Sequence, residues 1–169
     1  MRLVLVSLLA LVPVLSQAHR EHGAHEHGHG DLAIAFDGNN GRVELKAPSE
    51  SIYGFEHAAK TDKQKKQIDD AFAKLESKIG EMVAFDPELK CAFTKDGIEI
   101  VRENDKSSHS EVRAAFKVAC EKSPLGRSLT LDVAKQFPKL RHTQVTVLTD
   151  SVQKSAELGK KSLTIELKP

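Results

Sequence analysis

The chain has 169 residues, with 25 Lys and Arg against 24 Asp and Glu, and aromatic residues make up 5% of it. This length suits a single domain with its own hydrophobic core. The balanced charge and the scarcity of aromatic side chains argue against nucleic acid as a partner, because they leave no basic excess to neutralise phosphates and few rings on which bases could stack.

The first 18 residues, MRLVLVSLLALVPVLSQA, have the pattern of a secretory signal peptide. One positive charge, Arg2, precedes an apolar run over residues 3–15, and Ala18 is the small residue of a cleavage site. The apolar run is too short to remain as a transmembrane anchor. We therefore expect a signal peptide at residues 1–18, a periplasmic location, and a mature chain that begins at His19 without a stable membrane anchor.

Residues 19–30, HREHGAHEHGHG, contain five of the chain's eight histidines. A neutral imidazole nitrogen binds zinc, copper and nickel, and most unperturbed histidines are neutral near pH 7. This His-rich segment therefore indicates metal binding. The alternative is a solvated tail, which we disfavour because so many histidines stand beside so little other low complexity.

Within this segment, His25, His27 and His29 alternate, which would place all three side chains on one face of an extended chain. Neighbouring Cα atoms in that pattern are about 6.7 Å apart, so two of the rings can converge on one ion, whereas the outer pair cannot easily share one. Either Gly28 and Gly30 bend the chain, or a further ligand comes from elsewhere in the fold.

Residues 31–45 predict a β-hairpin, because two stretches of alternating apolar and polar residues flank a Gly- and Asn-rich turn at 37–41. A long amphipathic helix is predicted next, starting at a capping box of Thr61 and Gln64 and ending at Gly80. The apolar positions of the hairpin and of the helix are Leu32, Ile34, Phe36, Val43, Leu45, Ile68, Phe72, Leu75 and Ile79.

Alternating apolar residues predict further strands at 89–93, 98–100 and 112–120, the last being the longest such run. Asp96 and Gly97 lie between the first two stretches and form a turn signal. We therefore expect a turn between two short strands, followed by the longest strand of the sheet.

The two cysteines, Cys91 and Cys120, stand on the apolar faces of predicted strands. An exported chain meets an oxidising compartment, so the pair is interpreted first as a disulfide, with a pair of thiolate metal ligands as the alternative. Closing a loop of roughly thirty residues would stabilise the fold by about 3 kcal/mol.

Towards the C-terminus, residues 129–137 fit either a strand or a short helix that ends before a proline. Alternation at 145–147 and at 163–167 predicts two more strands. The predicted fold class is α+β: a mostly antiparallel sheet with one long amphipathic helix, a second short helix left open at 129–137, and one disulfide. This single domain occupies residues 31–169, after the signal peptide and the His-rich segment 19–30.

Three histidines lie outside the His-rich segment. His57 follows Glu56 just before the long helix, and His109 opens the longest strand. Both are candidate ligands that complete a metal site with residues 25–29. His142, which precedes a later strand, is interpreted as a surface or hydrogen-bonded histidine.

Two other kinds of chemistry are alternatives to zinc binding. A mature N-terminal His19 would offer its amine and its ring nitrogen together as a chelate, an arrangement that favours copper. Enzyme motifs such as HExxH, GxSxG and a P-loop do not occur in the sequence, and a disulfide-bonded thiol cannot act as a nucleophile. We therefore expect no catalytic residues and no enzyme.

Several stretches carry a family resemblance: HREHGAHEHGHGDLAIAFDGNN, ELKAPSESIYGFEHAAKTDKQK, LKCAF, FKVAC, FPKL and TQVTVLT. Together they resemble the ZrgA-like periplasmic zinc-binding family over nearly all of the mature chain, and HGAHEHGHG and GFEHA are the most specific parts. The resemblance implies zinc binding in the periplasm and zinc uptake alongside an importer. It marks as ligands His22, His25, His27, His29, Glu56 and His57.

Some relatives carry a long loop rich in His and Asp before the strand that matches residues 111–120. Here that loop is only residues 103–109, so the resemblance implies that the His-rich terminal segment does more of the binding.

The sequence therefore predicts a periplasmic protein that captures zinc and assists its uptake by an importer. Its expected metal ligands are His22, His25, His27, His29, Glu56, His57 and His109. One alternative is a copper chaperone or buffer that uses His19. The other is a domain that binds a zinc importer or its binding protein and holds metal only incidentally.

Overall fold

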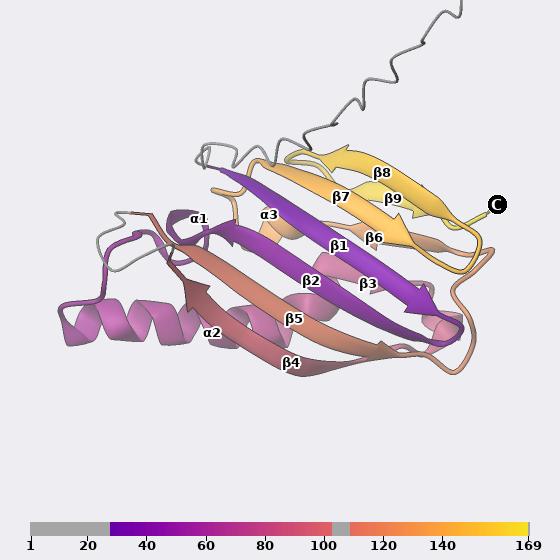
Figure 1. Cartoon of the computed structure of the whole chain (residues 1–169), viewed down its shortest axis with the longest axis horizontal. Coiled ribbons are helices and arrows are strands. Elements are labelled where there is room, and N and C mark those ends of the chain that lie inside the picture. The colour runs from indigo at the N-terminus through magenta and orange to yellow at the C-terminus, as the bar shows by residue number, and fades with distance from the viewer. Residues whose placement is uncertain (1–27, 103–108, 169) are drawn as a thin grey trace, which may run out of the picture.

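Nine strands and three α-helices lie within residues 28–102 and 109–168, the part of the chain that the computed structural model describes (Figure 1). The strands are β1 (His29–Asp37), β2 (Asn40–Pro48), β3 (Val83–Phe85), β4 (Ala92–Val101), β5 (Glu111–Ala119), β6 (Ser128–Leu131), β7 (His142–Leu148), β8 (Gln153–Leu158) and β9 (Leu163–Glu166). The helices are α1 (Ser49–Tyr53), α2 (Asp62–Met82) and α3 (Val133–Gln136), with a 3-10 turn at Pro87–Leu89.

The strands form two sheets. The larger has the order β4-β5-β2-β1-β7-β8, and the smaller has the order β3-β6-β9. All pairs are antiparallel except β1 with β7, which run parallel. The α+β fold with a long helix is confirmed, but the expectation of one mostly antiparallel sheet needs correction, because there are two sheets and the larger is mixed. A parallel pair needs a long crossover connection, and the chain between β1 and β7, which begins with β2, supplies it.

The predicted hairpin is confirmed as β1 and β2. Leu32 pairs with Leu45 and Ile34 with Val43, and these side chains are buried on the same face of the sheet. The turn closes at Gly38, whose φ of 55° lies in the left-handed region that glycine adopts without steric cost.

Helix α2 begins as predicted and ends later than predicted. Thr61 Oγ1 accepts a hydrogen bond from the Gln64 N–H at 3.2 Å, and Gln64 Oε1 accepts one from the Thr61 N–H at 3.3 Å, so the capping box is confirmed. The helix continues through Gly80 to Met82. A helical glycine costs about 1 kcal/mol, whereas burying a methionine side chain gains about 1.5–3 kcal/mol, and Met82 is buried in the core.

The predicted turn at Asp96 and Gly97 is wrong. β4 runs straight through these residues with only a register shift between Lys95 and Gly97, because both halves of the strand pair with the uninterrupted β5. The Asp96 carboxylate lies on the strand and accepts from Lys117 Nζ at 2.8 Å and from the Arg42 guanidinium. The Asp-Gly pair therefore produces a local irregularity rather than a reversal of the chain.

The ambiguous stretch at 129–137 contains both predicted structures, since β6 is followed directly by α3. Strands β3 and β8 were missed by the sequence analysis. The predicted Cys91–Cys120 disulfide is confirmed, and it joins the residue before β4 to the residue after β5.

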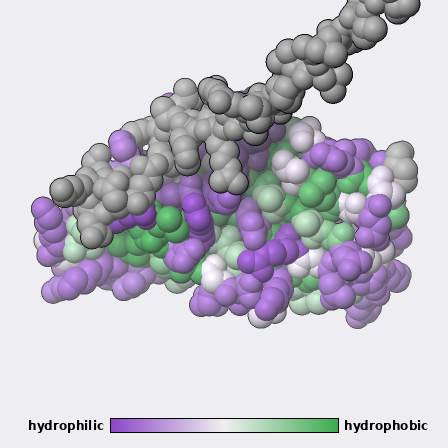
Figure 2. All heavy atoms as spheres, in the orientation of Figure 1, coloured by the Kyte–Doolittle hydropathy of each residue, from purple (hydrophilic) through white to green (hydrophobic). Residues whose placement is uncertain are grey.

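One hydrophobic core lies between the inner face of the six-stranded sheet and the layer formed by α2 and the smaller sheet (Figure 1). Leu75 of α2, Phe116 of β5 and Leu129 of β6 are among its fully buried side chains. The outer face of the six-stranded sheet is turned to the viewer in Figures 1 and 2, and hydrophilic side chains alternate with small apolar patches over this side of the molecule.

Candidate metal centre

Of the seven predicted metal ligands, His22, His25 and His27 lie outside the described residues, as does His19. The other four, His29, Glu56, His57 and His109, can be placed in the fold. The structure adds a fifth residue of interest, His142, which lies beside His29.

Glu56 and His109 are brought together by the fold. Glu56 Oε2 lies 2.7 Å from His109 Nδ1, and the Glu56 side chain is only 10% exposed while that of His109 is 51% exposed. A carboxylate can only accept, so Nδ1 is the protonated ring nitrogen and Nε2 carries the lone pair. A carboxylate that accepts from one ring nitrogen while the other nitrogen binds the ion is the usual arrangement around a metal-binding histidine.

The backbone around this pair is held by further hydrogen bonds. Ser110 Oγ donates to the Glu56 carbonyl at 2.7 Å, and the Ser49 N–H donates to the Ser110 carbonyl at 2.9 Å. Both serines are buried. The segment between α1 and α2 is thereby tied to the start of β5, which keeps Glu56 in reach of His109.

His57 is positioned differently from its neighbour Glu56. Its Nδ1 lies 2.9 Å from the Ala58 carbonyl, and its ring stacks on Phe55 with centroids 4.8 Å apart. The carbonyl again requires a proton on Nδ1, which leaves Nε2 of this exposed ring as the possible ligand atom.

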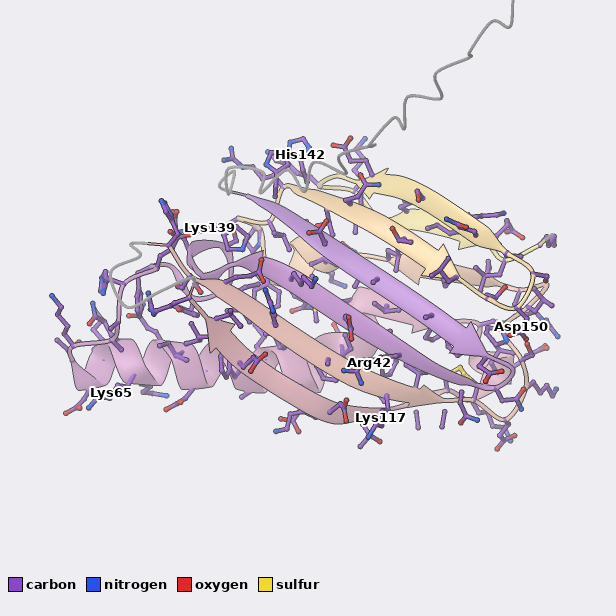
Figure 3. The ribbon with its side chains drawn as sticks, in the orientation of Figure 1. Arg42, Lys65, Lys117, Lys139, His142 and Asp150 are labelled. Carbon is purple, nitrogen blue, oxygen red and sulfur yellow. A yellow bond between two sulfur atoms is a disulfide. The ribbon has the colours of Figure 1, made fainter. Side chains whose placement is uncertain are left out.

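Besides the Glu56–His109 pair, two histidines lie side by side at the start of β1 and β7. His29 and His142 are direct partners in the parallel register, and their rings stack with centroids 4.8 Å apart at 13°. His142 Nδ1 lies 2.7 Å from Glu157 Oε1 on β8, so its Nε2 is also the nitrogen with the lone pair. Figure 3 shows His142 at the end of the sheet where β1 begins.

Two glycines fix the chain next to this pair. Gly28 has a φ of 84°, and its carbonyl accepts hydrogen bonds from the N–H groups of Arg141 and His142 at 2.9 and 3.0 Å. A Cβ on Gly30 would come within 2.8 Å of the Lys46 carbonyl. Of the two glycines that the sequence analysis considered as bends, Gly28 turns the chain, whereas Gly30 is part of β1 and is required for close packing.

Both pairs lie at the same end of the six-stranded sheet. His29 opens β1 and His142 opens β7, while Pro48 at the end of β2 pairs with Glu111, two residues after His109. In the strand order β5-β2-β1-β7, His29 on β1 lies two strand spacings from β5 and His142 on β7 lies three, or about 10 and 14 Å. The two pairs are therefore separate positions at this end of the sheet.

Within residues 28–102 and 109–168, no three His, Cys, Asp or Glu side chains are already grouped so that they could hold a metal ion. Each position as it stands offers one or two imidazoles and a carboxylate. The disulfide removes both thiols as ligands, because no cysteine is free. Completing either site requires a side-chain movement or a ligand from the His-rich segment.

The family comparison decides the broad function. A model described as ZrgA family zinc uptake protein matches residues 24–167. The chain belongs to the ZrgA family of zinc uptake proteins. The match to the family extends from just before His25 to just after β9 and includes both histidine pairs. A search of the curated proteins found no match.

Membership of the ZrgA family confirms the resemblance identified in the sequence and associates the chain with zinc uptake. In the described part of the chain, no helix is long and apolar enough to cross a membrane.

Sequence analysis missed Glu157 entirely and did not pair His142 with His29. Glu157 lies on β8, whose sequence QKSAEL has no apolar alternation that would predict a strand. The contact of His142 with Glu157 agrees with its interpretation as a hydrogen-bonded surface histidine. Its position beside His29 depends on the parallel pairing of β1 with β7, for which the sequence holds no local signal.

Proposed function

We propose that this chain is a periplasmic zinc-binding protein that captures zinc with its His-rich segment and a folded ligand pair, and that assists zinc uptake by an importer. Zinc is its cargo, and it catalyses no reaction. The observation that carries the proposal is the contact of Glu56 with His109, which orients an exposed ring with Nε2 as its ligand atom. This pair lies at the end of the sheet where the His-rich segment enters the fold.

The hydrophobic core supports capture and transfer rather than a structural role for zinc. Its side chains come from β1, β2, β5 and α2, and a disulfide closes the end of the sheet beyond β4 and β5. Structural zinc sites, by contrast, supply the folding energy of their domains. A fold that closes without metal can release the ion and remain intact, as a protein that delivers zinc must.

Exposure also favours exchangeable binding. The His109 side chain is about half exposed and His57 is exposed, so an ion held there can be reached by a competing ligand from a partner protein. The nearly buried Glu56 holds His109 in place, so the ligand is oriented before the ion arrives.

The test is a calorimetric zinc titration of the mature chain, starting at His19. His109→Ala and Glu56→Gln should each lower the affinity of one zinc equivalent by about 10–100-fold, with the circular dichroism spectrum unchanged. Glu121→Gln is the matched control, since it removes the same charge at the opposite end of the sheet, where Glu121 contacts Lys90.

Three outcomes would contradict the proposal. Absence of zinc binding by the wild-type chain would refute it outright. Tighter binding of copper than of zinc, abolished by His19→Ala, would favour the copper chaperone. Unfolding of the whole domain by a chelator would show that zinc is structural and not cargo.

A further inference from the structure

We propose that His29 and His142 form a second zinc position on the outer face of the sheet, with Glu157 orienting His142 through its Nδ1 atom. This assignment rests on the proposed function, because it adds ligands for the same cargo. It is separate from the Glu56–His109 position beside β5, which lies two strand spacings from β1 and three from β7.

The first argument is the register of the two strands. His29 and His142 are direct partners, and neighbouring strands lie about 4.8 Å apart. Both side chains are exposed and project from the outer face. Two imidazoles on adjacent strands at this spacing can converge on one ion with Zn–N bonds of about 2.0–2.1 Å.

The stacking of the two rings shows that the side chains already lie next to each other. Their centroids are 4.8 Å apart and their planes differ by 13°. Parallel rings do not point their lone pairs at one point between them, so one ring must rotate when the ion binds. The ring of His142 is held by Glu157 at its Nδ1 atom.

The second argument is the contact with Glu157. A carboxylate accepts only, so the 2.7 Å contact fixes the tautomer of His142 with its lone pair on Nε2. Carboxylates hold metal-binding histidines in this way, and their removal typically lowers metal affinity about 10–100-fold. The same contact also explains why His142 is oriented even though its side chain is 50% exposed.

The third argument is the presence of a nearby oxygen ligand. Asp31 lies two residues after His29 and is exposed on the same face. It pairs with Gln144, which in turn pairs with Glu157. Asp31 is thus the candidate oxygen ligand in the next row of the sheet, whereas Glu157 in that row holds His142. Lys46 stands opposite Asp31 on β2 and limits the net negative charge.

The experiment is a zinc titration of the mature chain followed by proton–nitrogen correlation spectra of the imidazole rings and by competition with a chromophoric chelator. It is made on the wild type and on a variant carrying His22→Ala, His25→Ala and His27→Ala, so that the terminal segment cannot mask a lost site. The His142 signals are assigned from their disappearance in His142→Ala.

In both proteins zinc should shift the Nε2 resonance of His142 while Nδ1 keeps its proton. In the triple-alanine background, His142→Ala should weaken zinc binding by at least about tenfold, and Glu157→Gln should weaken it less. Gln144→Ala is the matched control, because it alters the same face of the same strand without removing a ligand.

An Nε2 resonance that stays unmoved at saturating zinc would overturn the proposal, and the wild-type spectrum gives this answer even if a variant fails to fold. Unchanged affinity in His142→Ala would do the same. In either case, zinc binding by the wild type through other residues leaves the proposed function standing. A wild-type chain that binds no zinc removes both.

Discussion

The pairs Glu56–His109 and Glu157–His142 have the same contact distance but differ in how the glutamate is supported. In each, an Oε atom lies 2.7 Å from an Nδ1 atom. Glu56 is 10% exposed and its carbonyl is held by Ser110, whereas the Glu157 side chain is 65% exposed on β8, a strand at the edge of the six-stranded sheet.

This difference means that the same contact distance can hold an imidazole with different rigidity before the metal binds. An exposed ion pair contributes little, because water screens it and both side chains lose conformational freedom on forming it. A nearly buried carboxylate has fewer alternatives, so it holds the imidazole in one orientation before metal arrives. We therefore expect the Glu56–His109 position to bind zinc more tightly than the His29–His142 position, although the two look alike by distance.

The largest expected effect is on the stability of the fold, and it should leave zinc binding at the two positions unchanged. Replacing Cys91 and Cys120 together by alanine should lower the free energy of unfolding by about 3 kcal/mol. The disulfide lies at the opposite end of the six-stranded sheet from both pairs, so zinc affinity under native conditions should not change. Urea denaturation measures the free energy of unfolding, and calorimetry measures the zinc affinity. A loss of zinc affinity in the folded double variant would show that the two ends of the sheet are coupled.

Acidification should release zinc from both pairs without unfolding the chain. Imidazole must be neutral to bind zinc, so affinity should fall by about tenfold or more per pH unit below about pH 6.5. Hydrogen bonds from Lys117 and Arg42 hold the pKa of Asp96 below its usual range. A carboxyl with a lowered pKa stabilises the fold above its unfolded-state pKa and loses that contribution only as the pH falls through the lower value.

The Asp96 contacts should thus persist at pH 5.5 while zinc binding is largely lost. Zinc titrations and far-ultraviolet circular dichroism at pH 7.5 and 5.5 compare the two. Loss of the fold over this interval would mean that release is a consequence of unfolding.

The comparison between the glutamates is sharpened by matched substitutions. Glu56→Gln should weaken zinc binding about tenfold more than Glu157→Gln, since the effect of such outer residues spans about 10–100-fold and grows with their rigidity. Both variants remove one negative charge and keep the side-chain length. Equal effects would indicate that the support of the glutamate does not matter at this surface.

The smallest effect concerns Arg141, which packs next to Gly28 beside the His29–His142 position. Arg141→Gln removes a cation near the ion and should tighten zinc binding there by about fivefold or less, from a Coulomb repulsion of about 1 kcal/mol between a unit charge and a doubly charged ion at about 8 Å in water. Arg141→Lys keeps the charge and should bind as the wild type does. A gain at the Glu56–His109 position as well would point to a general charge effect.

The sequence predicted those parts of the fold that depend on neighbouring residues. The β1–β2 hairpin follows from alternation around a Gly- and Asn-rich turn, and the start of α2 follows from Thr61 and Gln64. The disulfide followed from the compartment and from the apolar faces that carry Cys91 and Cys120. Each of these signals lies within a few residues or in the composition of the chain.

The failures have a common physical cause, which is long-range pairing. Asp96 and Gly97 read as a turn because local propensity cannot include the pairing of both flanking segments with β5. The parallel register that places His29 beside His142 joins segments that are distant in the sequence, so no local pattern predicts it. Glu56 and His57 could be chosen as candidates from the sequence, but the contact of Glu56 with His109 required the fold.

The attachment of the N-terminal segment has a mechanical consequence. β1 lies inside the six-stranded sheet and is bonded to β2 on one side and to β7 on the other, and the Gly28 carbonyl adds two more bonds at the point of entry. Inter-strand hydrogen bonds run across the strands, so a pull on the segment along the axis of β1 loads two rows of bonds together, in shear. A strand at the edge of the sheet would be held by one such row only. A partner that pulls on the chain before His29 therefore loads both rows of bonds at once, and β1 stays in the sheet.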